Sequence, residues 1–416
     1  MTLPNLRRGK NNHYTMYDVA AAAFSVVFMQ SPSFLAYQQD MQRQEGRNNA
    51  RSLFGVERIP SDPQIRNLLD PITPEHLREP FWAVFSLLTQ AGFIAEYEYA
   101  GSLLLSLDGT GYFGSREIHC ENCTVAVRDG ITYYSHAVVL PALVRPGKAE
   151  VIALEPEFII PQDGAEKQDS EPKAAQRWIE RNAAAFAGHR VTVLADDLHC
   201  HQPFGQLLLD HGLDFIMTCK PDSHVTLYEE VAALNSIGAV EEVTDQVWTG
   251  HGHERRTYRY VNQVPLRADA KTLMVNWCEI TVVDETTGKV LYHNAFATNL
   301  PLSEQTVRPV VAAGRARWKI ENENNNVLKN QGYHLEHNYG HGCQYLSHVL
   351  VMLIVLAFLC HTVLQLADSK YQSLRAELAT RKKFFDDIRA LTRYLFFDSW
   401  EYLLDFMLAH LKRSPG

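Results

Sequence analysis

The chain has 416 residues, more than a typical single domain, so we expect a core with one or two attached domains. Hydrophobic residues make up 46% and charged residues 21% of the sequence, which excludes a disordered or fibrous protein. The formal net charge of −9 excludes a uniformly basic surface. Any contact with nucleic acid must therefore use local basic patches or bound metal ions.

Nothing near the first residues predicts secretion. Residues 1–12 include basic side chains, but no clean apolar stretch with a small-residue cleavage site follows them. The seven cysteines are typical of free thiols in a reducing compartment. Val349–Cys360 is an unbroken apolar run, but it is shorter than the about 20 residues that cross a bilayer. We expect it to be a buried helix of a cytoplasmic protein that has no membrane partner.

Residues 1–98 are expected to form a largely separate helical region. Asp18–Met29 and Pro80–Phe93 are apolar stretches, and Ser61-Asp62-Pro63 places a capping side chain before proline, as at a helix start. The polar stretch Arg43–Arg58 is expected to be a solvated loop, with a DNA contact as the alternative. The region is available for contacts with DNA ends or with a second copy of the chain.

From Gly101 onward, apolar runs alternate first with turns and then with helical stretches. Asp129-Gly130 separates two runs and predicts a β-hairpin, and the acidic Glu155–Pro172 predicts a loop. Strands that alternate with helices at this spacing indicate an α/β fold with a mixed sheet. The expected strands are Leu103–Leu107, Thr124–Arg128, Ile131–Leu143, Val191–Ala195 and Phe215–Cys219, and the expected helices are Lys173–Phe186 and Gln202–His211.

Residues 222–300 are expected to form a β-rich insertion. Val247–Val261, Thr272–Asp284 and Val290–Ala297 are rich in β-branched and aromatic residues, which favour strands. The chain after Pro301 is expected to be helical. The predicted domains are therefore a helical region (1–98), a core (99–221 and 301–416) and the insertion (222–300).

Acidic residues follow two of the predicted core strands. Asp108 precedes Gly109, where the chain is expected to turn sharply, and Asp196 and Asp197 follow Val191–Ala195. Ligands collect at the carboxyl edge of such a sheet. Successive side chains on a strand point to opposite faces, so we choose Asp196 and keep Asp197 as the alternate. An aspartate that caps a turn is the ordinary alternative for Asp108.

A third acidic residue lies on a predicted helix among basic and amide side chains. Arg317 and Glu321 are four residues apart and share a helix face, which a surface salt bridge would also explain. Glu323 is the alternate acid. The asparagines of residues 322–326 favour polar contacts over helix formation. Arginine offers a fork of donors to phosphate and lysine a point charge. The candidate DNA contacts are Arg315, Arg317, Lys319 and Lys329.

Two aspartates at strand ends and one glutamate on a helix are the ligands that a pair of Mg²⁺ ions needs. A two-metal site can activate water or a 3′-hydroxyl on one side of a phosphodiester and stabilise the leaving oxygen on the other. The sequence therefore predicts phosphodiester chemistry on nucleic acid, with Asp108, Asp196 and Glu321 as both metal ligands and catalytic residues.

These motifs, Leu-Asp-Gly-Thr at 107–110, Leu-Ala-Asp-Asp at 194–197 and Arg-Ala-Arg-Trp-Lys-Ile-Glu-Asn at 315–322, together resemble the DDE transposases of bacterial insertion sequences. The subgroup is the one with a Tyr-x2-Arg-x3-Glu-x6-Lys signature. The resemblance covers residues 101–345, and Arg317-x3-Glu321 matches the signature. Gly314 stands at the tyrosine position, and Lys329 lies one residue late relative to Glu321.

The resemblance implies an RNase H-like core that holds two Mg²⁺ ions, with Mn²⁺ as a substitute. It implies cleavage of transposon ends, strand transfer into double-stranded target DNA, and a homodimer on DNA. In members that form a DNA hairpin, an aromatic residue of the insertion stacks on a flipped base. Trp248 or Trp277 could fill that role, with a buried core tryptophan as the alternative.

The spacing of cysteine and histidine predicts another kind of metal site. His119-Cys120-x2-Cys123 has the spacing of half a zinc site, which predicts a structural Zn²⁺ at Cys120 and Cys123. His199-Cys200-His201, His251-x-His253 or His334-x2-His337-x3-His341 could supply the remaining ligands. The alternative functions are therefore a zinc-dependent hydrolase and a catalytically inactive, transposase-derived DNA-binding protein.

Overall fold

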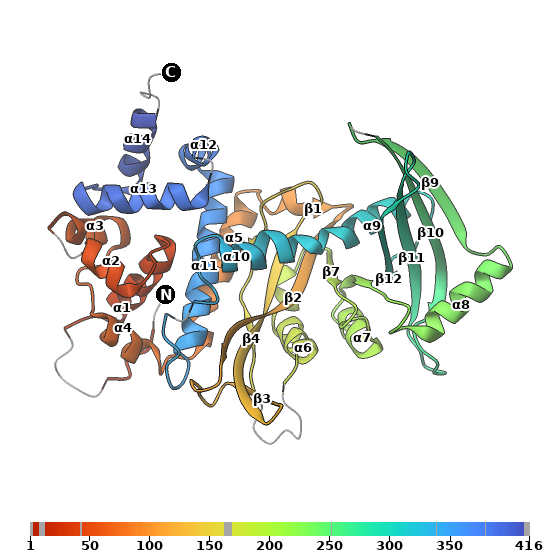
Figure 1. Ribbon diagram of the computed structural model, residues 1–416, viewed down its shortest axis with the longest axis horizontal. Helices are drawn as coiled ribbons and strands as arrows, with labels where there is room; N and C mark the ends of the chain where they lie inside the picture. The colour runs from red at the N-terminus through yellow and green to blue at the C-terminus, as the bar shows by residue number, and fades with distance from the viewer. Residues whose placement is uncertain are drawn as a thin grey trace.

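One mixed β-sheet runs through the protein (Figure 1). The computed structural model describes residues 3–7, 13–41, 44–161, 169–250, 252–337, 339–378 and 380–411. Within these ranges twelve strands pair in the order β3-β4-β2-β7-β8-β12-β11-β10-β9, with β1 beside β2 and with β5 and β6 beside β4. The predicted α/β class, a mixed sheet flanked by helices, is confirmed.

The strands are β1 (Glu98–Tyr99), β2 (Ser102–Ser115), β3 (Thr124–Arg128), β4 (Ile131–Val144), β5 (Ile152–Ala153), β6 (Glu157–Ile159), β7 (Val191–Ala195), β8 (Asp214–Thr218), β9 (Glu241–Trp248), β10 (His253–Pro265), β11 (Met274–Asp284) and β12 (Val290–Thr298). The helices before and within the sheet region are α1 (Met16–Phe28), α2 (Phe34–Met41), α3 (Gln44–Phe54), α4 (Asp62–Leu69), η1 (Pro74–Leu77), α5 (Glu79–Gln90), η2 (Ala95–Tyr97), α6 (Glu171–Asn182), η3 (Ala183–Phe186), α7 (Gln202–Asp210) and α8 (Val225–Ser236). Those after the sheet are α9 (Val307–Ala316), η4 (Ile320–Asn325), α10 (Asn326–Asn330), α11 (Leu346–Ala367), α12 (Ser369–Glu377), α13 (Arg381–Tyr394) and α14 (Trp400–Leu411).

Strand β2 is much longer than the apolar run that predicted it. It passes through Asp108 and Gly109 and pairs with β4 as far as Ser115. The expected sharp turn at Gly109 is therefore wrong, because β4 supplies backbone partners beyond the apolar residues. The hairpin between β3 and β4 is confirmed: Asp129 and Gly130 have φ angles of 50° and 75°, as a tight hairpin turn requires.

Strands β9–β12 continue the core sheet instead of forming a separate one. β12 pairs antiparallel with β8 through Phe296, Ala297 and Thr298, and β11, β10 and β9 follow outward. The region also contains the helix α8, which the sequence analysis did not predict within this β-rich stretch. Part of the predicted loop Glu155–Pro172 forms regular secondary structure, since β6 lies within it and α6 begins at Glu171. Residues 162–168 lie outside the described residues.

The N-terminal helices pack on the C-terminal helices, so residues 1–98 are not a separate unit. In Figure 1 the two groups, red and blue, lie together at one end of the molecule, with β9–β12 at the other. Helix α1 packs on α11, and Met29 and Leu53 share an apolar cluster with Phe384 and Leu403. This arrangement gives the strongly apolar α11 partners along its length.

The predicted solvated loop at Arg43–Arg58 is also wrong, although Arg43 itself lies outside the described residues. Gln44–Phe54 forms α3, and its Asn49 donates to the carbonyl oxygens of Thr392 and Leu395, both at 2.7 Å. The amide of Phe397 in turn donates to Asn49 at 2.9 Å. A polar side chain thus fastens this helix to the C-terminal region, which hydrophobic periodicity alone could not show.

Among the described residues, one helix is long and apolar enough to cross a membrane. It is α11, which has 22 residues and extends Val349–Cys360 at both ends, so the argument from its short length is wrong. The burial of the helix indicates its place instead, since 72% of its apolar window is buried inside the protein. The helix is therefore placed as a core helix.

A buried network of ion pairs fixes α6 against the sheet. Glu155 lies just before β6 and is 1% exposed; it accepts hydrogen bonds from Trp82 at 3.0 Å, Arg181 at 3.1 Å and Asn182 at 2.9 Å. These partners come from α5 and α6. One carboxylate therefore joins two helices to the edge of the sheet.

We expect Glu155→Ala to lower the free energy of unfolding by about 1–3 kcal/mol, because it leaves the buried amide of Asn182 and the indole N–H of Trp82 without their acceptor and removes the ion pair of the partly exposed Arg181. Chemical denaturation of the full chain measures the change. Glu229→Ala, at an exposed position of α8, is the control. A loss at Glu155 no larger than that of the control would contradict the role of the network.

Candidate active site

Two of the predicted acids emerge at the same edge of the sheet. The parallel pairing of β2 with β7 stops at Ser106, and Asp108 follows two residues later on β2. Strand β7 ends at Ala195, and Asp196 follows directly. β2 continues along β4 beyond this point, but its parallel pairing with β7 ends here, so Asp108 and Asp196 lie close together just past the last paired residues.

Glu321 reaches this edge from a helix. It lies in η4, a π-helical turn, which is a rare form that occurs frequently at functional sites. Arg317 joins the two acids: its Nη2 lies 2.8 Å from Glu321 Oε1, and its Nη1 lies 3.6 Å from Asp108 Oδ1. Asn325, one turn after Glu321, donates to Asp108 Oδ2 at 2.7 Å.

A buried histidine holds Asp196. His199 Nδ1 lies 3.0 Å from Asp196 Oδ1, and the amide of Leu198 donates to the same oxygen at 2.9 Å. On its other side, His199 Nε2 lies 3.9 Å from Glu171 Oε1. The imidazole therefore stands between two carboxylates.

Glu171 is a fourth acid of the group, and sequence reasoning missed it. The amide of Gly109 donates to Glu171 Oε1 at 3.0 Å, and a Cβ atom on Gly109 would lie only 2.1 Å from Oε2. The glycine after Asp108 therefore makes room for a carboxylate. Ser170-Glu171-Pro172 carries a helix-start signal, a capping serine followed by proline in the first turn, within the predicted loop Glu155–Pro172.

Burial and the charges of neighbouring groups shift the pKa values of Asp108, Glu171 and Asp196. Burial, followed by the charge of Glu321, raises the pKa of Asp108 to about 7; Glu171 and Asp196 add to the rise, and Arg317 opposes it. Burial also raises the pKa of Glu171. Burial acts to raise the pKa of Asp196 as well, but the hydrogen bond and charge of His199 outweigh it and lower that pKa.

The two alternate acids, Asp197 and Glu323, have other surroundings than the acids at the sheet edge. Asp197 accepts hydrogen bonds from the amide of Lys220 at 2.7 Å and from Ser223 Oγ at 2.5 Å, so it fixes the turn after β8. Glu323 is two residues from Glu321, and side chains at this spacing do not share a helix face. The structure thus groups Asp196 and Glu321 with Asp108 and places Asp197 in another contact.

The predicted DNA contacts differ in accessibility. Arg315 is exposed and lies over the ring of Tyr292 at 4.5 Å, and Lys319 is partly exposed. Lys329 forms an ion pair with Glu336 at 2.7 Å. Arg317 is 8% exposed, and its guanidinium faces the carboxylates.

Other residues singled out by the sequence also have clear surroundings. A Cβ on Gly314 would lie 2.7 Å from the ring of Phe296, so the close packing of α9 on β12 leaves no room there for the tyrosine of the family signature. Trp277 is buried in β11, whereas Trp248 is 60% exposed at the end of β9.

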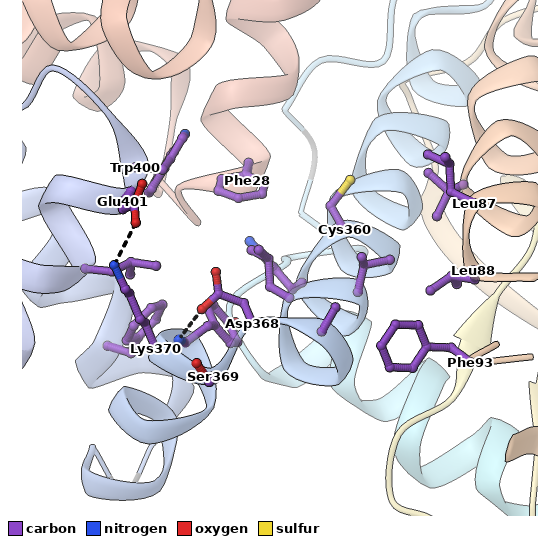
Figure 2. Close-up of a pocket in the computed structure, with 18 of the residues that line it drawn as sticks. Phe28, Leu87, Leu88, Phe93, Cys360, Asp368, Ser369, Lys370, Trp400 and Glu401 are labelled. Carbon is purple, nitrogen blue, oxygen red and sulfur yellow. Dashed lines mark hydrogen bonds and ion pairs between the residues drawn. The ribbon is translucent and has the colours of Figure 1, made fainter. Parts of the chain in front are cut away.

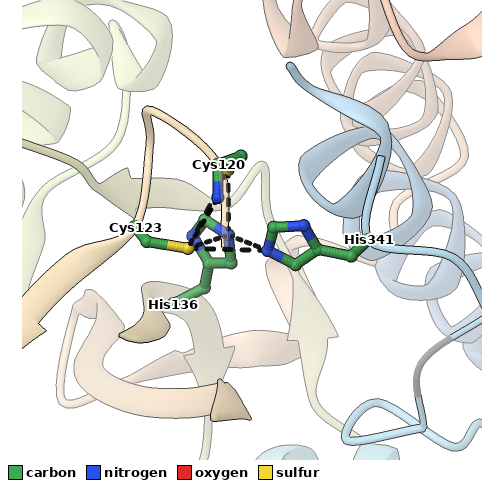
Figure 3. Close-up of side chains that lie close together, drawn as sticks. All are labelled: Cys120, Cys123, His136 and His341. Atoms are coloured by element: carbon green, nitrogen blue, oxygen red, sulfur yellow. Dashed lines mark hydrogen bonds between the residues drawn. The ribbon is translucent and has the colours of Figure 1, made fainter. Parts of the chain in front are cut away.

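A separate group of metal-binding side chains consists of Cys120, Cys123, His136 and His341, whose ligand atoms all lie within 4.8 Å of one another (Figure 3). These four residues could hold a metal ion. Burial lowers the pKa of His136 to about 4, so its imidazole is neutral, as a metal ligand must be. Sequence reasoning missed His136, although the β3–β4 hairpin pairs Thr124 with Ser135 and so brings the adjacent Cys123 and His136 together.

The other suggested zinc ligands lie elsewhere. His199 contacts Asp196, and Cys200 belongs to a second possible metal group with Cys219 and His224. His334 and His337 are not members of either group. His251 lies outside the described residues.

An apolar cavity of about 770 Å³ lies between the N-terminal and C-terminal helices (Figure 2). Phe28, Leu88 and Trp400 line it, with the ion pair of Lys370 and Glu401 on one side. None of the four acids is part of its lining. The acidic group at the sheet edge is therefore a different place from this cavity.

Comparison with models of known protein families gives no match, and comparison with curated protein sequences gives none at a significant level. The geometry of the site therefore carries the functional argument.

In the metal-free protein, we expect Asp108→Asn to raise the free energy of unfolding above pH 7. The folded pKa of about 7 lies above the unfolded value, so ionisation of Asp108 destabilises the fold as the pH rises from about 4 to beyond 7. A shift of this size corresponds to about 4 kcal/mol at most. The gain should shrink towards pH 4, where the carboxyl is protonated in both states.

Denaturation in EDTA at pH 5 and pH 8 measures this difference. Asp222→Asn, at an exposed aspartate, is the matched control and should show no such dependence on pH. A stabilisation by Asp108→Asn that is the same at both pH values would contradict the raised pKa.

Proposed function

We propose that the chain is a DDE transposase that cleaves transposon ends and transfers the strands into target DNA. One observation carries the proposal: Asp108, Asp196 and Glu321, from three distant segments, lie around shared partners at one edge of the sheet. They occur in the chain in the order Asp, Asp, Glu that the family resemblance requires. A partly buried acid with a strongly raised pKa, such as Asp108, is typical of functional sites.

The arrangement of the central strands supports an RNase H-like core. β6, β4 and β2 pair antiparallel, and β2, β7 and β8 pair parallel. Helix α6 precedes β7, and α7 precedes β8. Strands β9–β12 come between the second aspartate and the glutamate, as the insertion does in the family.

The donor set at the sheet edge fits Mg²⁺, with Mn²⁺ as a substitute. Four carboxylates face one guanidinium, so an excess of negative charge and several oxygen ligands are available. Hard divalent cations prefer such oxygens. Asp108, Asp196 and Glu321 would hold the ions, which when bound supply activation of the attacking oxygen and stabilisation of the leaving one.

The neighbouring side chains position these acids. Asn325 orients Asp108 by donating to one of its oxygens, and Arg317 holds Glu321 beside it. His199 orients Asp196 and lies near Glu171. Arg315 and Lys319 are the accessible basic residues beside the site and would contact phosphates of double-stranded DNA.

Two further parts of the proposal follow from the chemistry. Pairing of two transposon ends calls for a homodimer on DNA, and a DNA substrate calls for a cytoplasmic protein. Trp248, exposed on β9, is the candidate for stacking on a flipped base.

We expect Asp108→Asn, Asp196→Asn and Glu321→Gln each to lower DNA cleavage by about 10³-fold or more while DNA binding persists, because each removes a ligand of the proposed ions. The measurement is cleavage and strand transfer on a labelled end of the chain's own mobile element, with Mg²⁺ and with EDTA. Asp197→Asn and Glu323→Gln are the matched controls and should retain cleavage.

Other outcomes would favour the alternative functions. Binding of the labelled end with no cleavage by the wild-type chain would indicate an inactive, transposase-derived DNA-binding protein. Hydrolysis that survives Asp108→Asn but is lost in His224→Ala, in the second possible metal group, would indicate a zinc-dependent hydrolase. Cleavage that survives Glu321→Gln but is lost in Glu323→Gln would show that Glu323, and not Glu321, is the third metal ligand.

We expect Glu171→Gln to lower cleavage by about 10–100-fold and to raise the Mg²⁺ concentration needed for half-maximal rate. An oriented neighbour of metal ligands typically contributes this much. A titration of rate against Mg²⁺ separates the two effects. An unchanged Mg²⁺ dependence would show that Glu171 acts only in packing against Gly109.

A further inference from the structure

Four soft ligand groups meet past the end of β2, and the proposed cleavage reaction does not use them. Cys120 and Cys123 lie in the connection between β2 and β3, His136 lies on β4, and His341 lies shortly before α11. Figure 3 shows the two thiols and two imidazoles pointing toward one common point. The cluster therefore joins segments far apart in the chain, with 218 residues separating Cys123 from His341.

The separations fit a tetrahedral ion. With usual zinc–sulfur and zinc–nitrogen bonds, tetrahedral geometry places two sulfurs about 3.8 Å apart, a sulfur and a nitrogen about 3.6 Å, and two nitrogens about 3.3 Å. The two Sγ atoms are 3.9 Å apart, and the Nε2 atoms of the histidines are 3.0 Å apart. The Sγ–Nε2 distances are 3.5 Å for Cys120 to His136, and 3.4 Å and 3.5 Å from Cys123 to the two histidines.

Hydrogen bonds prepare the ligands. His341 Nδ1 lies 2.9 Å from the carbonyl oxygen of Gly342, so it donates there and leaves Nε2 as a lone pair toward the cluster. The amide of Cys120 donates to Cys123 Sγ at 3.4 Å. Cys123, His136 and His341 are buried, and Cys120 is partly so. Without an ion, these groups face one another away from solvent.

We propose that Cys120, Cys123, His136 and His341 bind one Zn²⁺ in a closed, structural site. Two thiolates and two imidazoles are a typical structural zinc set, and four protein ligands leave no position open for water or substrate. The soft thiolates disfavour Mg²⁺, so this ion is distinct from those of the carboxylates. The site stands independently of the proposed transposase activity.

The ion would clamp the segment between α10 and α11 onto the β3–β4 hairpin. Two other contacts reach the same segment: Asn122 Nδ2 donates to the carbonyl oxygen of Gln344 at 2.8 Å, and Asp70 accepts from the amide of Cys343 at 3.0 Å. Hydrogen bonds thus hold Cys343 and Gln344 of the segment, and the metal would hold His341. This segment follows the helix that carries Glu321.

The first test measures zinc and thiol protection in the untagged full chain. We expect about one Zn²⁺ per chain after purification, bound tightly enough to survive dialysis. An alkylating reagent should then modify the exposed Cys343 but not Cys120 or Cys123. After chelation, Cys120 and Cys123 should react as well, the melting temperature should fall, and added Zn²⁺ should reverse both changes.

Variants locate the site. Cys123→Ser and His341→Ala should lose the zinc, whereas Cys343→Ser and His119→Ala, at exposed neighbours of the ligands, should keep it. A wild-type chain without zinc, whose cysteines gain no protection from added Zn²⁺, would overturn the proposal. So would a disulfide between Cys120 and Cys123 in the freshly purified chain. The wild-type measurements decide the matter even where a variant fails to fold.

Discussion

Mutual repulsion among four carboxylates is the constraint that the site has to satisfy. Asp108, Glu171, Asp196 and Glu321 stand near one another with one guanidinium and one buried imidazole between them. Left alone, such a group would keep its acids apart or protonated. Rigid backbone holds them together instead: two come from adjoining parallel strands, and the others from helices packed on the same sheet.

The helices that carry the acids are themselves fixed by buried polar contacts. Helix α6, which begins with Glu171, is tied to the sheet through Glu155 at its other end. The π-helical turn η4 follows α9, which packs so closely on Phe296 that only glycine fits at residue 314. The glycine at residue 314 is therefore explained by the packing of α9 on β12.

The sequence predicted those elements whose pattern is local. β3 and β7 have the expected bounds, because each is a short β-branched run ended by turn residues. Helix α3 was missed because its asparagine faces a distant carbonyl and not a neighbouring turn. Strand β2 was cut short because its second half is held by β4 and not by its own apolar side chains.

The residues of the candidate site also fall into those that a local sequence pattern predicts and those that it does not. The structure brings the predicted Asp108, Asp196 and Glu321 together, since β7 and the spacing of Arg317 and Glu321 could be read from local sequence, and their catalytic role stays a prediction. Glu171 could not be found in this way, because it reaches the cluster only through the contact of α6 with β2. His136 could have been found by extending the predicted β3–β4 hairpin by one residue pair, which places it beside Cys123. Gly109 gave a misleading signal, because a glycine that admits a carboxylate looks the same in sequence as one that makes a turn.

The two clusters share a scaffold, which gives the second cluster a structural purpose. Strand β2 carries Asp108 and then leads to Cys120, and the chain leads from Glu321 through α10 to His341. The same two segments thus meet twice, once at the carboxylates and once at the thiols and imidazoles. Two points of attachment restrict rotation of one segment on the other more than one does. A soft-ligand cluster at the far point can therefore hold η4 against β2 although its ligands never touch the acids.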